Sequence, residues 1–113
     1  MPTIESYDFG RIVIDGRAHT RDVIILPDRV VSDWWRKDGH SLVPEDLESV
    51  ATELPGHLVI GTGAYGRMKP EPRALEELRT RGIEVEVLET ERAVARYGEL
   101  NPAESAAALH LTC

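Results

Sequence analysis

Residues 61–66 place glycines in the order G-x-G-x-x-G, directly after the apolar run 57–60. In dinucleotide-binding proteins this string cradles a pyrophosphate, because a helix begins inside it and points free N–H groups at the anion. Here Pro70 and Pro72 delay the next helix by several residues, and neither has an N–H group to offer. We therefore expect a tight structural loop and no dinucleotide cofactor.

Two other uses of this loop stay open. Its backbone N–H groups could bind a small anion, with Arg67 and Lys69 adding positive charge. Glu89 ends the next apolar run, where an acid that binds a ribose could stand. Both uses would put a ligand at the end of a strand, which is where open α/β sheets bind ligands.

The four histidines and the single cysteine give no metal-binding pattern. No two histidines lie four residues apart, so no helix face presents a pair of ligands, and we expect no bound metal. His110 and Cys113 are close enough in sequence for the imidazole to act as a base toward the thiol. We favour a structural thiol, because a negative charge next to Cys113 would oppose thiolate formation.

Trp34 and Trp35 are adjacent, so in an extended segment one side chain points into the core and the other points outward. The outward tryptophan, with Arg36 and His40 close behind it, could form an aromatic wall for a ligand or a partner. The alternative is a core tryptophan and a second tryptophan at the margin of the sheet.

None of the serines has the G-x-S-x-G setting of a hydrolase.

The elements that must position these residues follow from the apolar pattern. The first third is β-rich, with apolar runs at 12–14, 23–26 and 30–35 separated by turn signals such as Asp15-Gly16. Helices are predicted at 44–54, 72–81 and 90–100, the third with Thr90 as its N-cap. The runs 57–61 and 83–88 flank the second helix and should therefore be parallel neighbours. The segment 106–113 could be helical by propensity, but its place right after a helix and its closing Leu-His-Leu-Thr alternation favour a last strand.

Length and composition limit the class of protein. The 113 residues suit one domain, 1–113, with a 42% hydrophobic composition that supports a core. The net charge of -7 argues against a nucleic-acid or membrane-surface partner, since both attract Lys and Arg. A single cysteine and an N-terminus without a basic and apolar leader lead us to expect a cytoplasmic protein without a signal peptide.

Several short motifs occur together, once each, in this chain. They are Trp34-Trp35-Arg36 with Gly39-His40, the strand and loop 58–63, the segment 82–85, Leu88-Glu89-Thr90 with Ala93 and Tyr97, and the closing 106–113. In this ordered combination the chain resembles the Mth-938-like domain family. That family includes the adipogenesis-associated domain-containing protein and a mitochondrial complex I assembly factor.

The resemblance implies a three-layer α/β fold with a central mixed sheet. It implies no established enzymatic activity and no catalytic residues, whereas the assembly-factor relatives suggest a role in binding. One departure is visible, because Gly98 follows Tyr97 where the family often has Asn. A capping or pocket-lining role of that Asn would be missing or altered in this chain.

We therefore expect a single α/β domain of three layers, with a central, partly parallel sheet, flanking helices and an N-terminal β-rich part. We expect it to bind a protein partner or to serve assembly, without catalysis. The alternative is a small-molecule-binding protein or a small enzyme that uses the loops after the parallel strands. The hypothetical ligand-binding residues are Trp35, Arg36, His40, Gly61, Thr62, Gly63, Glu89 and Thr90.

Overall fold

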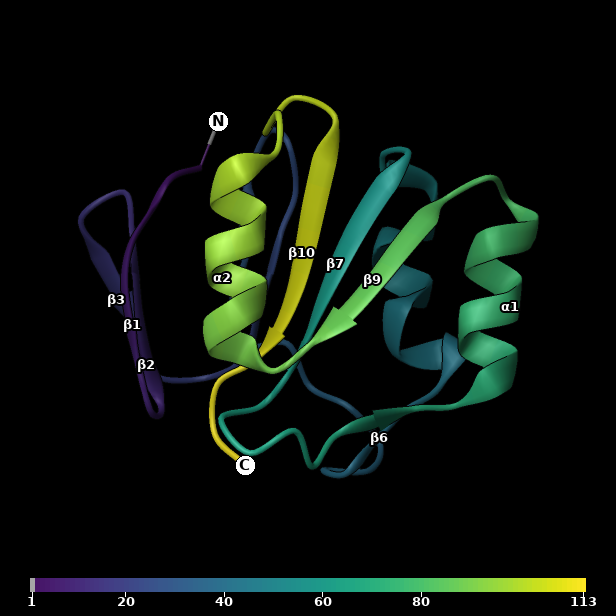
Figure 1. Cartoon of the computed structure of the whole chain (residues 1–113), viewed down its shortest axis with the longest axis horizontal. Coiled ribbons are helices and arrows are strands. Elements are labelled where there is room, and N and C mark those ends of the chain that lie inside the picture. Colours follow the sequence, from purple (N-terminus) through teal and green to yellow (C-terminus); the bar gives the residue numbers. More distant parts are fainter. Residues whose placement is uncertain (1) are drawn as a thin grey trace.

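The computed structural model describes residues 2–113, which form three small sheets and three helices (Figure 1). In chain order the elements are β1 (Ile4–Asp8), β2 (Arg11–Ile14), β3 (Arg17–His19), β4 (Val23–Ile25), β5 (Val30–Val31), β6 (Ser41–Leu42), the 3₁₀ helix η1 (Pro44–Glu53), β7 (His57–Thr62), β8 (Lys69–Pro70), α1 (Pro72–Thr80), β9 (Glu84–Leu88), α2 (Thr90–Glu99) and β10 (Ser105–His110). No helix within residues 2–113 is long and apolar enough to cross a membrane.

The central sheet has five strands in the order β5-β4-β10-β7-β9. β10, β7 and β9 run parallel, whereas β4 and β5 are antiparallel to their neighbours. The expected parallel pairing of 57–61 with 83–88 is confirmed, because β7 and β9 are adjacent and α1 lies in the crossover between them. β10 is the expected last strand, and it is buried along its whole length.

Alternate residues of the central strands pack into two hydrophobic cores, one on each face of the sheet. Leu58 and Ile60 of β7 point toward η1 and α1, while Val59 points toward α2 and the N-terminal strands. In Figure 1, α2 lies in front of the sheet and the antiparallel sheet β1-β2-β3 stands beside it. The molecule is therefore the expected three-layer α/β domain, and both faces of the sheet are covered.

Two expectations for the middle of the chain were wrong in detail. The run 30–35 is a strand only at Val30–Val31, because Asp33 has a positive φ of 54° and the Trp34 amide bonds to the Asp22 carbonyl instead. The helix expected at 44–54 is present but is a 3₁₀ helix, η1. Asp46 fixes its first turn by accepting the Val43 amide at 2.9 Å, and it also accepts the Lys37 amide at 3.1 Å.

The two tryptophans separate as expected. Trp34 is 7% exposed and its indole N–H donates to the Asp46 carbonyl at 2.9 Å. Trp35 is 77% exposed. Gly98, named above as a departure from the resemblance, is exposed on α2, and an added Cβ would meet no atom within 4 Å. A longer side chain at this position would therefore extend from the surface and would not enter the core.

Tyr97 on α2 provides a test of how the second core is built. Its ring is buried, burial raises the pKa of its phenol, and its hydroxyl has no hydrogen-bond partner within residues 2–113. Because an unsatisfied buried hydroxyl is destabilising, Tyr97→Phe is expected to raise the free energy of unfolding by about 1 kcal/mol in urea denaturation.

Tyr7 is the matched control, since its hydroxyl donates to the Leu111 carbonyl at 2.9 Å. Tyr7→Phe is expected to lower the free energy of unfolding by about 1 kcal/mol. A loss of stability in Tyr97→Phe equal to that in Tyr7→Phe would show that the Tyr97 hydroxyl is bonded in solution.

Candidate binding surface at the carboxyl edge of the sheet

The loops after β7 and β9 meet at the edge where the three parallel strands end, which we call the carboxyl edge. The Thr90 amide donates to the Gly63 carbonyl at 3.1 Å. The Thr90 hydroxyl accepts the Gly63 amide at 2.8 Å and donates to the His110 carbonyl at 2.6 Å. The predicted N-cap role of Thr90 was wrong, because Thr90 is already helical and its hydroxyl links the ends of three strands instead.

Gly61 and Thr62 belong to the same buried unit. A Cβ at Gly61 would lie 2.9 Å from the Thr90 hydroxyl oxygen, so the close approach of α2 to β7 needs a glycine there. The Thr62 hydroxyl donates to the Leu88 carbonyl at 3.1 Å. Both threonine hydroxyls at this edge are therefore used within the fold.

The glycine-rich loop packs against the C-terminal residues. Gly63 has a φ of 103°, and an added Cβ would lie 2.3 Å from the carbonyl carbon of Cys113. Three amides in and just after this loop have internal acceptors: the Ala64 amide bonds to Thr112 O at 2.5 Å, the Gly66 amide to Gly63 O at 3.2 Å and the Arg67 amide to Cys113 O at 2.9 Å. Amides engaged in this way do not form an anion cradle, which supports a structural role for the G-x-G-x-x-G string.

A buried ionic cluster of Asp22, Arg36 and His110 lies beside this loop. The Asp22 carboxylate accepts a hydrogen bond from Arg36 Nη1, lies 2.8 Å from His110 Nδ1 and accepts the Leu111 amide at 2.8 Å. Burial alone would raise the pKa of Asp22, but the hydrogen bonds from His110, Arg36 and Leu111 outweigh it and hold the pKa below its usual value.

Arg36 connects this cluster to the tryptophan segment. Its guanidinium lies 5.1 Å from the centre of the Trp34 ring, and Nη2 donates to the Gly39 carbonyl at 3.2 Å. Sequence reasoning missed Asp22, because an isolated aspartate before an apolar run carries no local signal of its partners. The cluster holds the segment 34–39 against the end of β10.

The predicted site residues do not form one site. Gly61, Thr62, Gly63 and Thr90 come together, and Arg36 is linked to them through Asp22 and His110. His40 is exposed beside β8, where its carbonyl accepts the Lys69 amide at 2.9 Å. Trp35 lines a separate depression with Lys37, Glu45 and Ser49.

The accessible part of the carboxyl edge is aromatic. Phe9, in the turn between β1 and β2, is 56% exposed, and Tyr65, in the glycine-rich loop, is 66% exposed. Their ring centres lie 6.0 Å apart, and we call these two residues the aromatic pair. Next to Tyr65 is an open groove of about 330 Å³, whose lining includes Lys69, Val87 and Glu89. Sequence reasoning missed the pair, because its members are 56 positions apart.

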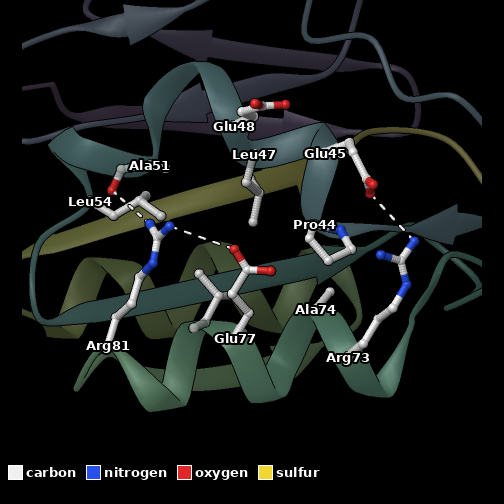
Figure 2. A pocket seen from close by; sticks show the side chains of 11 residues that line it. Pro44, Glu45, Leu47, Glu48, Ala51, Leu54, Arg73, Ala74, Glu77 and Arg81 are labelled. Carbon is white, nitrogen blue, oxygen red and sulfur yellow. Dashed lines mark hydrogen bonds and ion pairs between the residues drawn. The ribbon is translucent and has the colours of Figure 1, made fainter.

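A second groove, of about 290 Å³, lies between η1 and α1 (Figure 2). Leu47, Leu54 and Leu78 supply its apolar lining. An ion pair crosses it at one end, where Arg73 lies 3.4 Å from Glu45. At the other end Arg81 donates a hydrogen bond to the Ala51 carbonyl of η1 at 3.5 Å and also pairs with Glu77 of α1 at 3.6 Å. These charged side chains already connect the two helices above the apolar lining.

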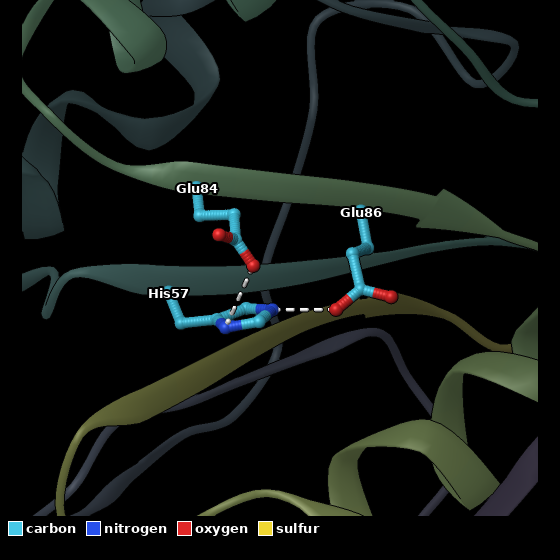
Figure 3. A group of neighbouring side chains, drawn as sticks. All are labelled: His57, Glu84 and Glu86. Carbon is cyan, nitrogen blue, oxygen red and sulfur yellow. Dashed lines mark hydrogen bonds and ion pairs between the residues drawn. The ribbon is translucent and has the colours of Figure 1, made fainter.

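At the opposite end of the parallel strands, His57 lies between Glu84 and Glu86 (Figure 3). Nε2 is 2.6 Å from Glu86 and Nδ1 is 3.5 Å from Glu84, so each ring nitrogen faces a different carboxylate. Arg96 also bonds both oxygens of Glu86 at 3.0 Å. Burial would raise the pKa of Glu86, but Arg96 and His57 outweigh it and lower the pKa. These contacts form a network in which Arg96 and His57 share the Glu86 carboxylate, and Glu84 lies beside the other nitrogen of the His57 ring.

Comparison with known proteins agrees with the geometry. PH1505 from Pyrococcus horikoshii, described as a conserved hypothetical protein, is 29% identical with a TM-score of 0.83, over 98% of this chain and 99% of that one. MT938 is 28% identical with a TM-score of 0.78, over the whole of both chains. A protein from Bordetella pertussis, described as a Mth938-like domain, shares the fold at 19% identity and a TM-score of 0.67, over 97% of this chain and 85% of that one. Residues 4–111 match the family described as "Protein of unknown function (DUF498/DUF598)", and the chain belongs to this family, as the resemblance to Mth-938-like domains predicts.

Proposed function

We propose that this protein is a binding module and that the aromatic pair, Phe9 and Tyr65, is the centre of its contact surface for a protein partner. Exposed aromatic side chains are enriched at protein interfaces, where they bury a large area at a small cost in side-chain entropy. Two such rings in contact on the surface are the observation that carries the proposal.

The two loops that carry these rings are held firmly. The Gly10 amide, next to Phe9, bonds to the Leu111 carbonyl at 2.9 Å. The amide of Ala64, next to Tyr65, bonds to the Thr112 carbonyl at 2.5 Å. Because both loops are fixed to the same C-terminal segment, the rings are preorganised and binding would cost little additional ordering.

The state of the polar groups also favours binding over catalysis at this edge. An active site needs polar groups that converge on an open cavity. Here the hydroxyls of Thr62 and Thr90 are bonded to backbone groups, and the Asp22 carboxylate is bonded to Arg36 and Leu111. The resemblance to a family that contains an assembly factor points in the same direction.

The proposal is tested with the double variant Phe9→Ser/Tyr65→Ser. Partners are first captured from the native cells with the wild-type protein, and each purified partner is then titrated against the variants. We expect the double variant to bind at least about tenfold more weakly, because aromatic residues at the centre of an interface commonly contribute about 2 kcal/mol or more. Arg79→Ser, an exposed change on α1, is the control and should bind as the wild type does.

Two outcomes would contradict the proposal. The first is a purified partner whose affinity for the double variant stays within twofold of wild type. The second is loss of binding in Trp35→Ser with no loss in the double variant, which would move the contact surface to the other exposed aromatic residue. Retention of a small molecule at the groove beside Tyr65, seen by native mass spectrometry, would support the alternative function of ligand binding.

A further inference from the structure

The outer edge of β9 has no strand beside it. β9 is the last strand in the order of the central sheet and pairs with β7 alone (Figure 1). The Glu84 amide bonds toward β7, to the Gly56 carbonyl at 2.9 Å. Since alternate residues of a parallel strand face the same neighbour, Val85 and Val87 direct their N–H and C=O groups outward. Within residues 2–113 these outward groups bond to no other backbone segment.

The side chains along this edge alternate in chemistry. Glu84 and Glu86 lie on one face of the strand, while Val85 and Val87 lie on the other. The Glu84 side chain is 72% exposed and Val87 is 38% exposed. Glu86 is occupied by Arg96 and His57, so Glu84 is the carboxylate with free capacity to accept a new cation.

This pattern disfavours a second copy of the chain as the occupant. Pairing β9 with the same strand of another copy would gather Glu84 and Glu86 of both copies on one face of the joined sheet. Carboxylates that face each other across strands destabilise the pair, and each copy already has a net charge of -7. A strand that complements the outer edge of β9 would have basic residues opposite the glutamates and aliphatic residues opposite the valines.

We propose that the outer edge of β9 takes up an extended segment of another protein in which Lys or Arg alternates with aliphatic residues. Backbone hydrogen bonds to Val85 and Val87 supply the attachment, as in other cases of strand addition. Glu84 selects for a basic residue, and Val87 contacts an aliphatic one. Val87 and Tyr65 line the same groove, but the inference rests on the outward backbone groups of β9 and on Glu84, so it does not depend on the proposed function.

The probe is a blocked eight-residue peptide in which lysine and valine alternate, titrated into the full chain and followed by NMR. The control peptide has the same composition with the four lysines before the four valines, so it cannot place one residue type on each face. We expect saturable shifts along β9 with the alternating peptide alone. At a free concentration of about ten times Kd, amide exchange of Val85 and Val87 should slow about tenfold. The amide chemical shifts of Glu86 and Leu88, which already bond to β7, should change less than those of Val85 and Val87.

Two variants separate the contributions of charge and backbone. Glu84→Lys is expected to weaken binding of the lysine peptide and to create binding of a matched glutamate–valine peptide. Val87→Pro removes an outward N–H at an edge position that tolerates proline, and it should weaken binding at least about tenfold. A urea denaturation midpoint close to wild type would show that Val87→Pro is folded.

The inference is overturned if the alternating peptide gives no saturable shifts at millimolar concentration. It is also overturned if Val87→Pro binds as wild type does, or if the block peptide binds equally well. Phe9→Ser, which changes the member of the aromatic pair that does not line the groove with Val87, should bind the peptide within twofold of wild type. A failure of the aromatic pair in the capture experiment therefore leaves this result unaffected, and the two proposals fail separately.

Discussion

Gly63→Ala is expected to lower the free energy of unfolding by about 3 kcal/mol. One part of this loss is conformational, because the φ of 103° is unfavourable for any residue with a Cβ. The other part is steric, since the Cβ would lie 2.3 Å from the carbonyl carbon of Cys113 and 2.8 Å from Cδ2 of His110. Moving Cys113 away would break its hydrogen bond with the Arg67 amide.

Two other glycines separate these contributions. Gly82 has a φ of 82° with no atom within 4 Å of an added Cβ, so Gly82→Ala should cost only about 1–2 kcal/mol. Gly98 is helical and open to solvent, so Gly98→Ala should raise stability by about 0.5–1 kcal/mol. Urea denaturation of the three variants is the measurement. Equal losses at Gly63 and Gly82 would show that the C-terminal segment moves aside at no cost.

Much of the sheet could be predicted from the sequence because two of its parallel strands, β7 and β10, are buried on both faces. Such strands appear as continuous apolar runs, as 57–60 does, and local sequence is enough to identify them. For β10 the alanines also suit a helix, and the alternation at 109–112 was needed to predict a strand. The crossover helix α1 then dictates the parallel pairing of β7 and β9. The strand β1 was not predicted, because only two of its five residues, Ile4 and Tyr7, are even partly buried.

The candidate binding surface was much less predictable, because its contacts join distant parts of the chain. The Thr90 hydroxyl would serve as an N-cap by local rules, but the carbonyl of His110, 20 residues away, is its acceptor. Phe9 and Tyr65 become neighbours only when the β1–β2 turn and the glycine-rich loop both pack on the C-terminal residues. Local propensity carries no information about such contacts.

Asp22→Ala is expected to lower the free energy of unfolding by about 3–5 kcal/mol, because it leaves the Arg36 guanidinium buried without its carboxylate. The Arg36 side chain is 4% exposed, so water would not replace the lost partner. His110 Nδ1 and the Leu111 amide would lose the same carboxylate. Urea denaturation at pH 7 measures the change.

The charge of Asp22 also predicts a pH dependence. Its pKa is lower in the folded protein than its ordinary value of 3.8, so the stabilisation is complete above about pH 4. It is lost as the pH falls below 3.8 and through the lower pKa of the folded state. The stability difference between wild type and Asp22→Asn should therefore be constant from about pH 7 to about pH 5 and shrink below about pH 4. A difference that stays constant down to about pH 2 would contradict the ionic role.

The pairing itself is tested by removing both charges. In Arg36→Met, Asp22 keeps its contacts with His110 and Leu111, so this variant should lose less stability than Asp22→Ala does. In the double variant Asp22→Ala/Arg36→Met no buried guanidinium is left without a partner. The double variant should therefore be more stable than Asp22→Ala alone, with a coupling energy of about 1–3 kcal/mol. Additive losses would mean that Arg36 finds another acceptor or reaches water, and the cluster would then fix the segment 34–39 by packing and not by charge.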